Sequence, residues 1–289
     1  MEQTLTVFAQ LLVAGVLTGL LFALVAVGLT LVYGVMDVVN FAHGEFLMLA
    51  MYASAGLSLL GLQPLLGLPV VAAALFLFGL VVYRLVIGRL LQGPSEATIF
   101  GTFGLLVLMQ GLAQALFTSD YRSARHLPFQ GTVHAGGIAV SQASLVEALG
   151  ALVLTGLLFA FVEYTETGRA LRALAEDRVA ATLMGINVGR MNALAFGLGS
   201  ACVGAAGALL MLSYPVYPTV GAEFALTAFI VVALGGFGKI QGALVGALIV
   251  GLLEVFGGFY LAPQFKMVPV YVAFLVIVLV RPQGLMGRR

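Results

Sequence analysis

Long apolar runs separated by short polar breaks dominate the sequence. A helix that spans a membrane needs about 20 mostly apolar residues, and runs of this order recur along the whole chain. The run that begins at Phe224 is short before Gly235, so it is a candidate half-span or re-entrant segment. The pattern predicts an all-α, polytopic integral membrane helical bundle with eight or nine membrane segments, formed as a single domain over residues 1–289. The candidate spans are residues 7–33, 46–62, 65–84, 98–118, 146–164, 192–212, 224–238, 241–262 and 267–281.

The composition supports a chain that lies mostly in lipid. Hydrophobic residues make up 62% of the 289 residues and charged residues 9%, whereas about a quarter of an average soluble chain is charged. This excludes an ordinary soluble domain and makes membrane lipid the main surroundings of the chain. The net charge is +1, and no cluster of basic residues with interleaved aromatic residues occurs, so we expect no nucleic-acid partner.

Lysine and arginine fall mainly in loops that alternate to one face of the predicted bundle. Cytoplasmic loops carry an excess of these residues, so loops 84–97 and 163–191 and the C-terminus are expected in the cytoplasm. Loop 119–145 is then extracytoplasmic, whereas residues 34–45 carry no basic residue and leave the side of the N-terminus open. Ten of the 13 basic residues lie on the cytoplasmic face: Arg84, Arg89, Arg169, Arg172, Arg178, Arg190, Lys239, Arg281, Arg288 and Arg289. The other three are Arg122, Arg125 and Lys266.

Residues 33–46 form the most polar interruption between two apolar runs. They place four polar side chains where such groups are costly and usually face a bundle interior or a watery cavity. Gly34 and Gly44 permit a break in the helix, which is tolerated at membrane depth where the backbone is buried in protein or lines a cavity. One interpretation is the lining of a translocation path, and the other is an interfacial turn in which Asp37 or Asn40 caps a neighbouring helix. The four residues are Asp37, Asn40, His43 and Glu45.

Residue types that carry catalysis or bind metals do not form a recognisable pattern. His126 and His134 are remote from the polar break, and no Cys/His spacing or pair of nucleophile and base emerges. The glycine-rich run at 235–239 is not a phosphate-binding loop, because Ala233 and Ile240 stand where that loop needs Gly and Ser or Thr. We therefore expect no catalytic residue, no metal and no cofactor, and we expect any ATP hydrolysis to occur on another chain.

The segment from Glu163 to Arg190 is the longest hydrophilic loop on the basic side, yet it is partly apolar. A short amphipathic helix in this loop could place its apolar face in a groove of a partner. It could equally lie at the lipid headgroups, held by its arginines. The residues alone leave both interpretations open. The apolar residues concerned are Leu171, Leu174, Ala181, Leu183 and Met184, and the arginines are Arg169, Arg172 and Arg178.

Several motifs resemble one transporter family. Asn40-Phe-Ala-His-Gly-Glu45, followed by Tyr52, closely resembles the signature of branched-chain amino acid ABC transporter permeases, specifically the H-type member of a two-permease pair. The sequence departs from that pattern at Ala50-Met51, where the family often has Gly-Ala, and at Lys239, where a small or polar residue is usual. The resemblance covers nearly the whole chain and continues through Arg169-Ala-Leu-Arg-Ala173, Ala180-Ala-Thr-Leu-Met-Gly-Ile-Asn187, Phe196, Ala205-Ala-Gly-Ala208, Gly235-Gly-Phe-Gly238, Gly242-Ala-Leu-Val-Gly246 and Arg281-Pro-Gln-Gly-Leu-Met-Gly287.

The resemblance implies the permease subunit of an ATP-binding cassette importer in a bacterial inner membrane. The implied substrate is a small molecule, a branched-chain or related amino acid, and the alternatives within the family are urea, amides and other small solutes. The implied partners are a homologous M-type permease, two cytoplasmic ATPase subunits and an extracytoplasmic solute-binding protein. Permeases of such importers dock on the ATPase through a loop like 163–191, with a glycine that permits the turn after the helix. The coupling residues implied here are Arg169, Leu171, Leu174, Leu183 and Gly185.

An ion-coupled secondary transporter is the competing class. It would need acidic residues in the membrane as a relay, and Asp37 and Glu45 are the candidates near the first spans. It would also be expected to contain inverted repeats, and no convincing internal repeat is visible in the sequence. These features favour the permease interpretation.

Overall fold

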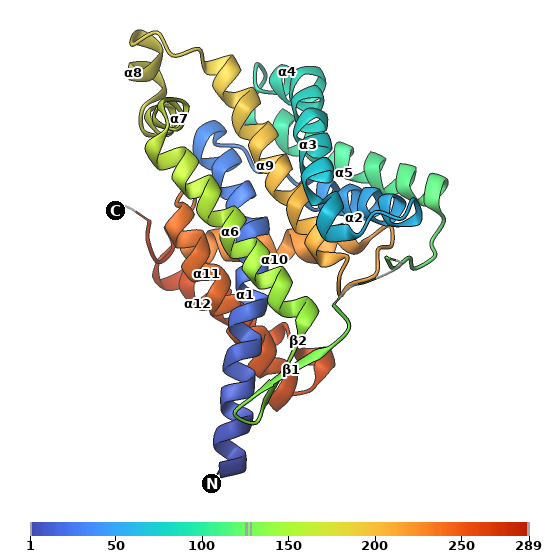
Figure 1. Cartoon of the computed structure of the whole chain (residues 1–289). Coiled ribbons are helices and arrows are strands. Elements are labelled where there is room, and N and C mark those ends of the chain that lie inside the picture. Colours follow the sequence, from blue (N-terminus) through green and yellow to red (C-terminus); the bar gives the residue numbers. More distant parts are fainter. Residues whose placement is uncertain (1, 125–126, 128, 288–289) are drawn as a thin grey trace.

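The helices follow the apolar runs, because a backbone in lipid must satisfy its hydrogen bonds within its own segment. The computed structural model describes residues 2–124, 127 and 129–287, and Arg125, His126, Arg288 and Arg289 lie outside this part. The helices are α1 (Glu2–Met36), α2 (His43–Leu59), α3 (Pro64–Val82), α4 (Gly88–Leu90), α5 (Ser95–Phe117), α6 (Gln142–Tyr164), α7 (Glu166–Glu176), α8 (Arg178–Leu183), α9 (Val188–Leu210), α10 (Val220–Gly235), α11 (Ile240–Tyr260) and α12 (Val268–Val280) (Figure 1).

Seven helical segments in the described residues are long and apolar enough to cross a membrane. They are α1, α5, α6, α9, α11, the continuous α3–α4 segment, and α12 with the turn before it. A π-helical turn, Tyr83–Ile87, joins α3 to α4, and a 3-10 turn, Pro263–Phe265, precedes α12. The predicted eight or nine membrane segments are reached only when the shorter α2 and α10 are added to these seven spans, and neither of the two is long enough to cross.

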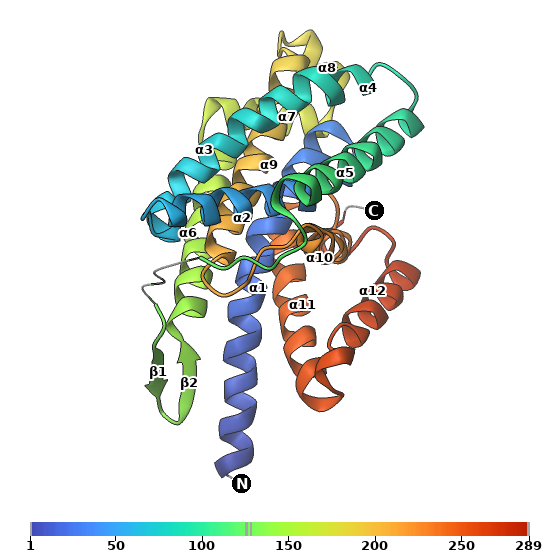
Figure 2. The same cartoon turned by 90° about the vertical axis from the view of Figure 1, so that its right-hand side faces the viewer.

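The candidate span at residues 46–62 corresponds to α2, which is an internal helix. α2 has 17 residues, which is about 25 Å at about 1.5 Å per residue. It runs across the direction of α1 at mid-height of the molecule, as does α10 (Figure 1 and Figure 2). Twelve of the 17 residues of α2 are buried, so its apolar character reflects contact with protein. α10 has 16 residues, in agreement with the expected half-span.

Two groups of four helices have matching contacts and opposite directions. The first group is α1, α2, α3 and α5, and the second is α9, α10, α11 and α12. In order, each helix of the first group corresponds to one of the second. α1 packs on α11 as α9 packs on α3, and α2 packs on α9 as α10 packs on α1. The contacts between α1 and α9 and between α2 and α10 each join corresponding helices. α1 and α3 run upward in Figure 1, whereas α9 and α11 run downward. The chain therefore contains an inverted repeat of helices, which the sequence analysis did not detect.

Glycines lie where the helices of the two groups cross. A Cβ atom on Gly44 of α2 would overlap the carbonyl oxygen of Gly221 of α10, and a Cβ on Gly221 would overlap that of Gly44. On α1, a Cβ on Gly28 would lie 2.7 Å from the carbonyl oxygen of Gly199 of α9. Such contacts let backbones approach closely in lipid, where dispersion and weak hydrogen bonds must replace the hydrophobic effect.

The end of the bundle opposite α7 and α8 carries a β-hairpin. Strands β1 (Thr132–Ala135) and β2 (Ile138–Ser141) pair antiparallel within the predicted extracytoplasmic loop. The side-chain amide of Gln10 on α1 donates to the Ala139 carbonyl at 2.6 Å and accepts from the Ala139 N–H at 2.8 Å. The N-terminal part of α1 therefore lies at the same end of the bundle as loop 119–145, and the two are expected on the same side of the membrane.

The crossing of α2 and α10 gives a direct test of the fold. We expect Gly44→Ala to destabilise the bundle by about 1–3 kcal/mol, because overpacking a tight contact forces the backbones apart. Gly56→Ala on the same helix is the control, because a Cβ there meets nothing within 4 Å. Thermal unfolding in detergent, followed by size-exclusion chromatography, measures the difference. Equal midpoints for the two variants would show that the crossing does not depend on the glycine.

Candidate functional site

The structure separates Asp37 from the other three residues of the predicted path. Asp37 directly follows α1 in the left-handed conformation, with φ 54°, and its N–H donates to the Tyr33 carbonyl at 2.7 Å. Its exposed side chain lines a cavity of about 800 Å³ that Arg172, Arg178 and Lys239 also line. The cavity brings together the loops that the basic residues place in the cytoplasm, so Asp37 lies at that end of the bundle.

Asn40, His43 and Glu45 are all buried where α1 gives way to α2, with exposed fractions of 3%, 2% and 0%. The side-chain oxygen of Asn40 accepts from the Ala42 N–H at 3.1 Å, a local contact typical of an asparagine that shapes a turn before a helix. The Nε2 atom of His43 lies 3.0 Å from the Val25 carbonyl oxygen of α1. Asn40 thus acts locally in the turn before α2, whose N-cap residue Ala42 makes no side-chain cap hydrogen bond, and His43 joins α2 to α1.

Glu45 joins α2 to α5. Its Oε1 atom accepts from the Gln110 side-chain amide at 2.9 Å, and its Oε2 atom is buried without a hydrogen-bond partner. α5 is among the least buried spans of the chain, so this hydrogen bond is a specific contact that connects a loosely packed helix to α2. Ionisable groups buried within membrane segments commonly mark substrate or ion pathways, which makes the α2–α5 boundary a candidate path.

The predicted coupling loop contains two helices, α7 and α8, that meet at Asp177. α7 is amphipathic and packs on α1, α6 and α9. Leu171 and Leu174 on its inner face are 1% and 3% exposed. Both were expected to be coupling residues accessible to a partner, and the structure corrects this, because both side chains are part of the core of the bundle. Arg169 on the outer face pairs with the highly exposed Glu166, at 3.8 Å, a contact of little energetic consequence.

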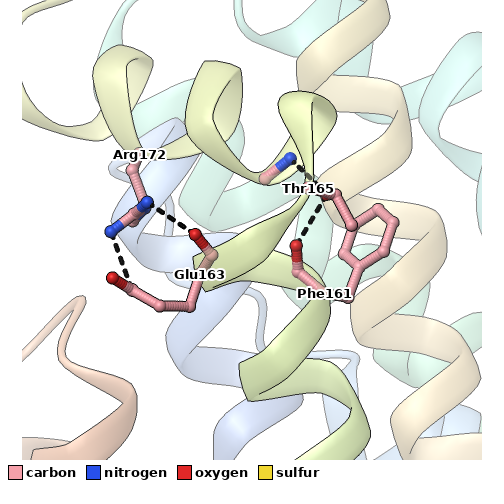
Figure 3. Close-up of polar contacts among 5 residues, drawn as sticks. Phe161, Glu163, Thr165 and Arg172 are labelled. Atoms are coloured by element: carbon pink, nitrogen blue, oxygen red, sulfur yellow. Dashed lines mark hydrogen bonds and ion pairs between the residues drawn. The ribbon is translucent and has the colours of Figure 1, made fainter.

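A set of contacts fixes α7 to the end of α6 (Figure 3). Arg172 donates from Nη1 to Glu163 Oε2 at 2.7 Å and from Nη2 to the Glu163 backbone carbonyl at 2.9 Å. The Thr165 hydroxyl donates to the Phe161 carbonyl at 2.7 Å and accepts from the Gly168 N–H at 2.9 Å. A Cβ on Gly168 would overlap two carbonyl oxygens of α6, so the first turn of α7 lies directly on the last turn of α6.

α8 projects from the bundle and presents apolar side chains to the surroundings. Val179, Leu183 and Met184 are 71%, 82% and 83% exposed. The carboxylate of Asp177 accepts from the Val179 and Ala180 N–H groups at 2.8 and 2.9 Å, which caps the helix at its start.

Gly185 ends α8 as the resemblance implied. It has φ +83°, and its N–H donates to the Thr182 carbonyl at 3.0 Å, while the Ile186 N–H donates to the Ala181 carbonyl at 3.1 Å. This pair of bonds is the Schellman motif, which favours glycine at the left-handed position. The concave side of α7 and α8 forms an open pocket of about 520 Å³ that is lined by four alanines, four charged residues, Met184 and Ile186.

Several contributors to these sites were not found from the sequence. Gln110 lies in the middle of an apolar span, and nothing local connects it to Glu45, which is 65 residues away. Thr165 and Gly168 form a Thr-x-x-Gly pattern that gives no sign of the close contact with α6. Among the described residues no group of three or more His, Cys, Asp or Glu side chains could hold a metal ion.

Comparison with known proteins gives consistent matches over the whole chain. Residues 11–280 match the family described as "Branched-chain amino acid transport system / permease component". The chain is 34% identical over 310 aligned residues to the high-affinity branched-chain amino acid transport system permease protein LivH of Escherichia coli K12, an alignment that covers 100% of this chain and 98% of the relative. It is 32% identical over 299 residues to the permease protein BraD of Pseudomonas aeruginosa, covering 97% and 96% of the two chains.

A solved structure has a similar fold at low sequence identity. A chain of "PsaBC from Streptococcus pneumoniae in complex with Fab" superimposes with a TM-score of 0.52 and 14% identity, covering 93% of this chain and 91% of that chain. At this identity the similarity concerns the fold alone. The family match and the full-length relatives together establish that this chain belongs to the family of branched-chain amino acid transport system permease components.

Proposed function

We propose that the chain is the transmembrane permease subunit of an ATP-binding cassette importer and moves branched-chain or related amino acids across a bacterial inner membrane. All of residues 1–289 form one permease domain, with a cytoplasmic coupling segment at 163–191 and an extracytoplasmic loop at 119–145. The partners are a homologous M-type permease, two cytoplasmic ATPase subunits and an extracytoplasmic solute-binding protein. The permease itself does not hydrolyse ATP.

The arrangement of α7 and α8 is the observation that supports this proposal most strongly. One side of the segment is fixed to α6 by backbone contact and hydrogen bonds, and the other side presents the exposed apolar side chains of Val179 and Leu183 on α8 and of Met184 directly after it. A helix that docks in a groove of a partner depends on a few such apolar anchors. A helix held only at lipid headgroups would need no rigid connection to α6, so the structure favours docking on an ATPase.

The substrate class is inferred from the relatives, whose names specify branched-chain amino acid transport. An aliphatic zwitterion carries no net charge, which suits a path with few charged groups. Urea, amides and other small solutes are the alternative substrates, and ion-coupled secondary transport is the alternative mechanism.

We further propose that the path opens along α2, where Glu45 and Gln110 connect α2 to α5. Glu45 is fully buried in this conformation, so the path is closed here and opens when α5 moves relative to α2. The unpartnered Oε2 atom of Glu45 then gains access to water or solute. His43 and Asn40 support this boundary by holding the start of α2 in place.

Uptake assays in vesicles test the energy source and the substrate. With both permeases, the ATPases and the binding protein reconstituted, we expect leucine uptake that requires ATP and continues when a protonophore is added. Excess unlabelled isoleucine should compete, and excess urea should not. The purified chain alone should hydrolyse no ATP above background. Uptake driven by an imposed proton gradient without ATP would assign the chain to secondary transport.

Two exposed side chains at the end of α8 provide the test of coupling. We expect the double variant Leu183→Asp/Met184→Asp to lose the ATPases on purification and to lose ATP-dependent uptake, because charges would enter a desolvated groove. Leu60→Asp is the matched control, because Leu60 is 83% exposed and lies in a different loop. If the double variant keeps its ATPases and its uptake, the segment lies at the lipid headgroups.

Leu174 and Leu183 should respond differently to truncation. We expect Leu174→Ala to destabilise the permease by about 2–5 kcal/mol, the usual cost of removing a buried leucine, whereas Leu183→Ala should change its stability by less than about 0.5 kcal/mol. Thermal unfolding of the isolated permease separates the two effects. Equal destabilisation by the two substitutions would contradict the assignment of Leu183 to a free docking face.

Glu45 provides the test of the path. We expect Glu45→Gln to lower ATP-dependent uptake at least several-fold while the complex still assembles, since the substitution keeps the shape and removes the acid. Gln110→Ala should act in the same direction, because it frees α5 from α2. Parental uptake rates in both variants, with normal assembly, would assign Glu45 to packing alone.

A further inference from the structure

Glu147 lies in a small cavity near the extracytoplasmic end of the bundle. The residue is on the second turn of α6, just after the β-hairpin, and the cavity has a volume of about 240 Å³. α1 contributes Thr18 and Phe22 to the lining, α6 contributes Ser144, and the connector before α10 contributes Ser213 and Tyr214. Hydroxyl groups thus surround one carboxyl group, and leucine and phenylalanine side chains of α1 form the remaining wall.

The Glu147 carboxyl group lacks a cationic partner in the described part of the chain. Its side chain is buried, with 5% exposed, and its Oε1 atom has no hydrogen-bond partner. Lys266 is engaged by Glu254, at 2.7 Å, and Arg122 donates to the Phe117 carbonyl at 2.7 Å. The carboxyl group has a side-chain hydrogen bond with Ser213, but a buried carboxylate oxygen without a partner is costly, so a positive group from outside the chain would stabilise it.

The lining indicates which kind of positive group fits. The cavity is far larger than a single bare ion, and one wall is apolar, as in sites for small organic ligands that use a few polar groups for orientation. Burial raises the pKa of the Tyr214 phenol, so its hydroxyl stays neutral and adds no second negative charge. An ammonium group has three N–H donors, which match the carboxylate and the neighbouring hydroxyl oxygens.

We propose that the Glu147 cavity binds a primary ammonium group attached to an apolar or flexible organic part. Two sources carry this chemistry at the extracytoplasmic face, a free aliphatic amino acid and the headgroup of phosphatidylethanolamine. The first source rests on the proposed function, whereas the second does not. In both cases the ammonium group pairs with Glu147, and the rest of the ligand lies against α1.

Two variants and a control distinguish the effect of the Glu147 charge from the effect of the cavity volume. Glu147→Gln removes the charge and keeps the shape, and Ser144→Leu fills the cavity and keeps the charge. Glu96→Gln, an exposed acid in the first turn of α5, is the control. Each variant is purified as the complex with the second permease and the ATPases, without the binding protein, in nanodiscs of mixed phosphatidylethanolamine and phosphatidylglycerol.

The binding measurements use probes that differ in the ammonium group. Labelled L-leucine is compared with N-acetyl-L-leucine by equilibrium binding, and retained phosphatidylethanolamine is compared with phosphatidylglycerol by mass spectrometry after delipidation. We expect one of the two ammonium probes to bind at least tenfold less to both cavity variants than to the parent and the control. Loss of leucine binding identifies the free amino acid as the source of the ammonium group, and loss of phosphatidylethanolamine retention identifies the lipid.

Failure of this proposal is distinguishable from failure of the proposed function. If neither ammonium probe changes in Glu147→Gln, or if the probes without an ammonium group change equally, the cavity is not an ammonium site, whatever the uptake assay shows. If phosphatidylethanolamine retention depends on Glu147 while ATP-dependent uptake is absent, the site stands and the importer proposal fails.

Discussion

Contact between the backbones of α2 and α10, centred on Gly44 and Gly221, is the constraint on which the interior of this protein depends. Neither helix is long enough to cross a membrane, so each needs protein on all sides to satisfy the ends of its backbone. The glycine contact lets the two helices cross at mid-height, and α1 and α9 enclose them. The irregular connectors before α2 and α10 are tolerated for the same reason. Asn40, His43 and Glu45 are buried because the crossing draws the start of α2 into the bundle.

The sequence predicted the long spans well, because spanning lipid requires a length and an apolar character that are visible in any single segment. It misread α2 as a span, because a helix surrounded by protein is as apolar as one surrounded by lipid. The sequence analysis grouped Asp37 with Glu45 because the two are only eight residues apart. Asp37 is exposed directly after α1, whereas Glu45 is buried in α2. Leu174 and Leu183 looked equivalent in the loop, and only the packing of α7 on α6 distinguishes a core residue from an exposed one. The hairpin at 132–141 pairs through backbone atoms and gave no apolar pattern.

The inverted repeat changes how the classes of transporter are distinguished. Its two halves share the order and the contacts of their helices and run in opposite directions, none of which requires similar residues, so comparison of the sequence with itself did not detect it. The sequence analysis counted the apparent absence of a repeat against secondary transport. That argument no longer holds, because a repeat is present and repeats of this kind occur widely in transporters. The assignment therefore rests on the family match over residues 11–280 and on the segment of α7 and α8. Both are independent of whether a repeat is present.

The junction between α6 and α7 determines how a displacement of α8 would reach the bundle. The ion pair between Arg172 and Glu163 joins side chains that are 42% and 40% exposed, and pairs of this kind contribute about 0–1 kcal/mol. It is too weak to transmit the motion alone. The contact of Gly168 with the end of α6 is a different constraint, because no rearrangement of side chains can relieve a collision between backbones. A push on α8 is therefore carried through α7 into the axis of α6, and α6 packs along α1, the helix that leads directly into the α2 boundary where Glu45 lies.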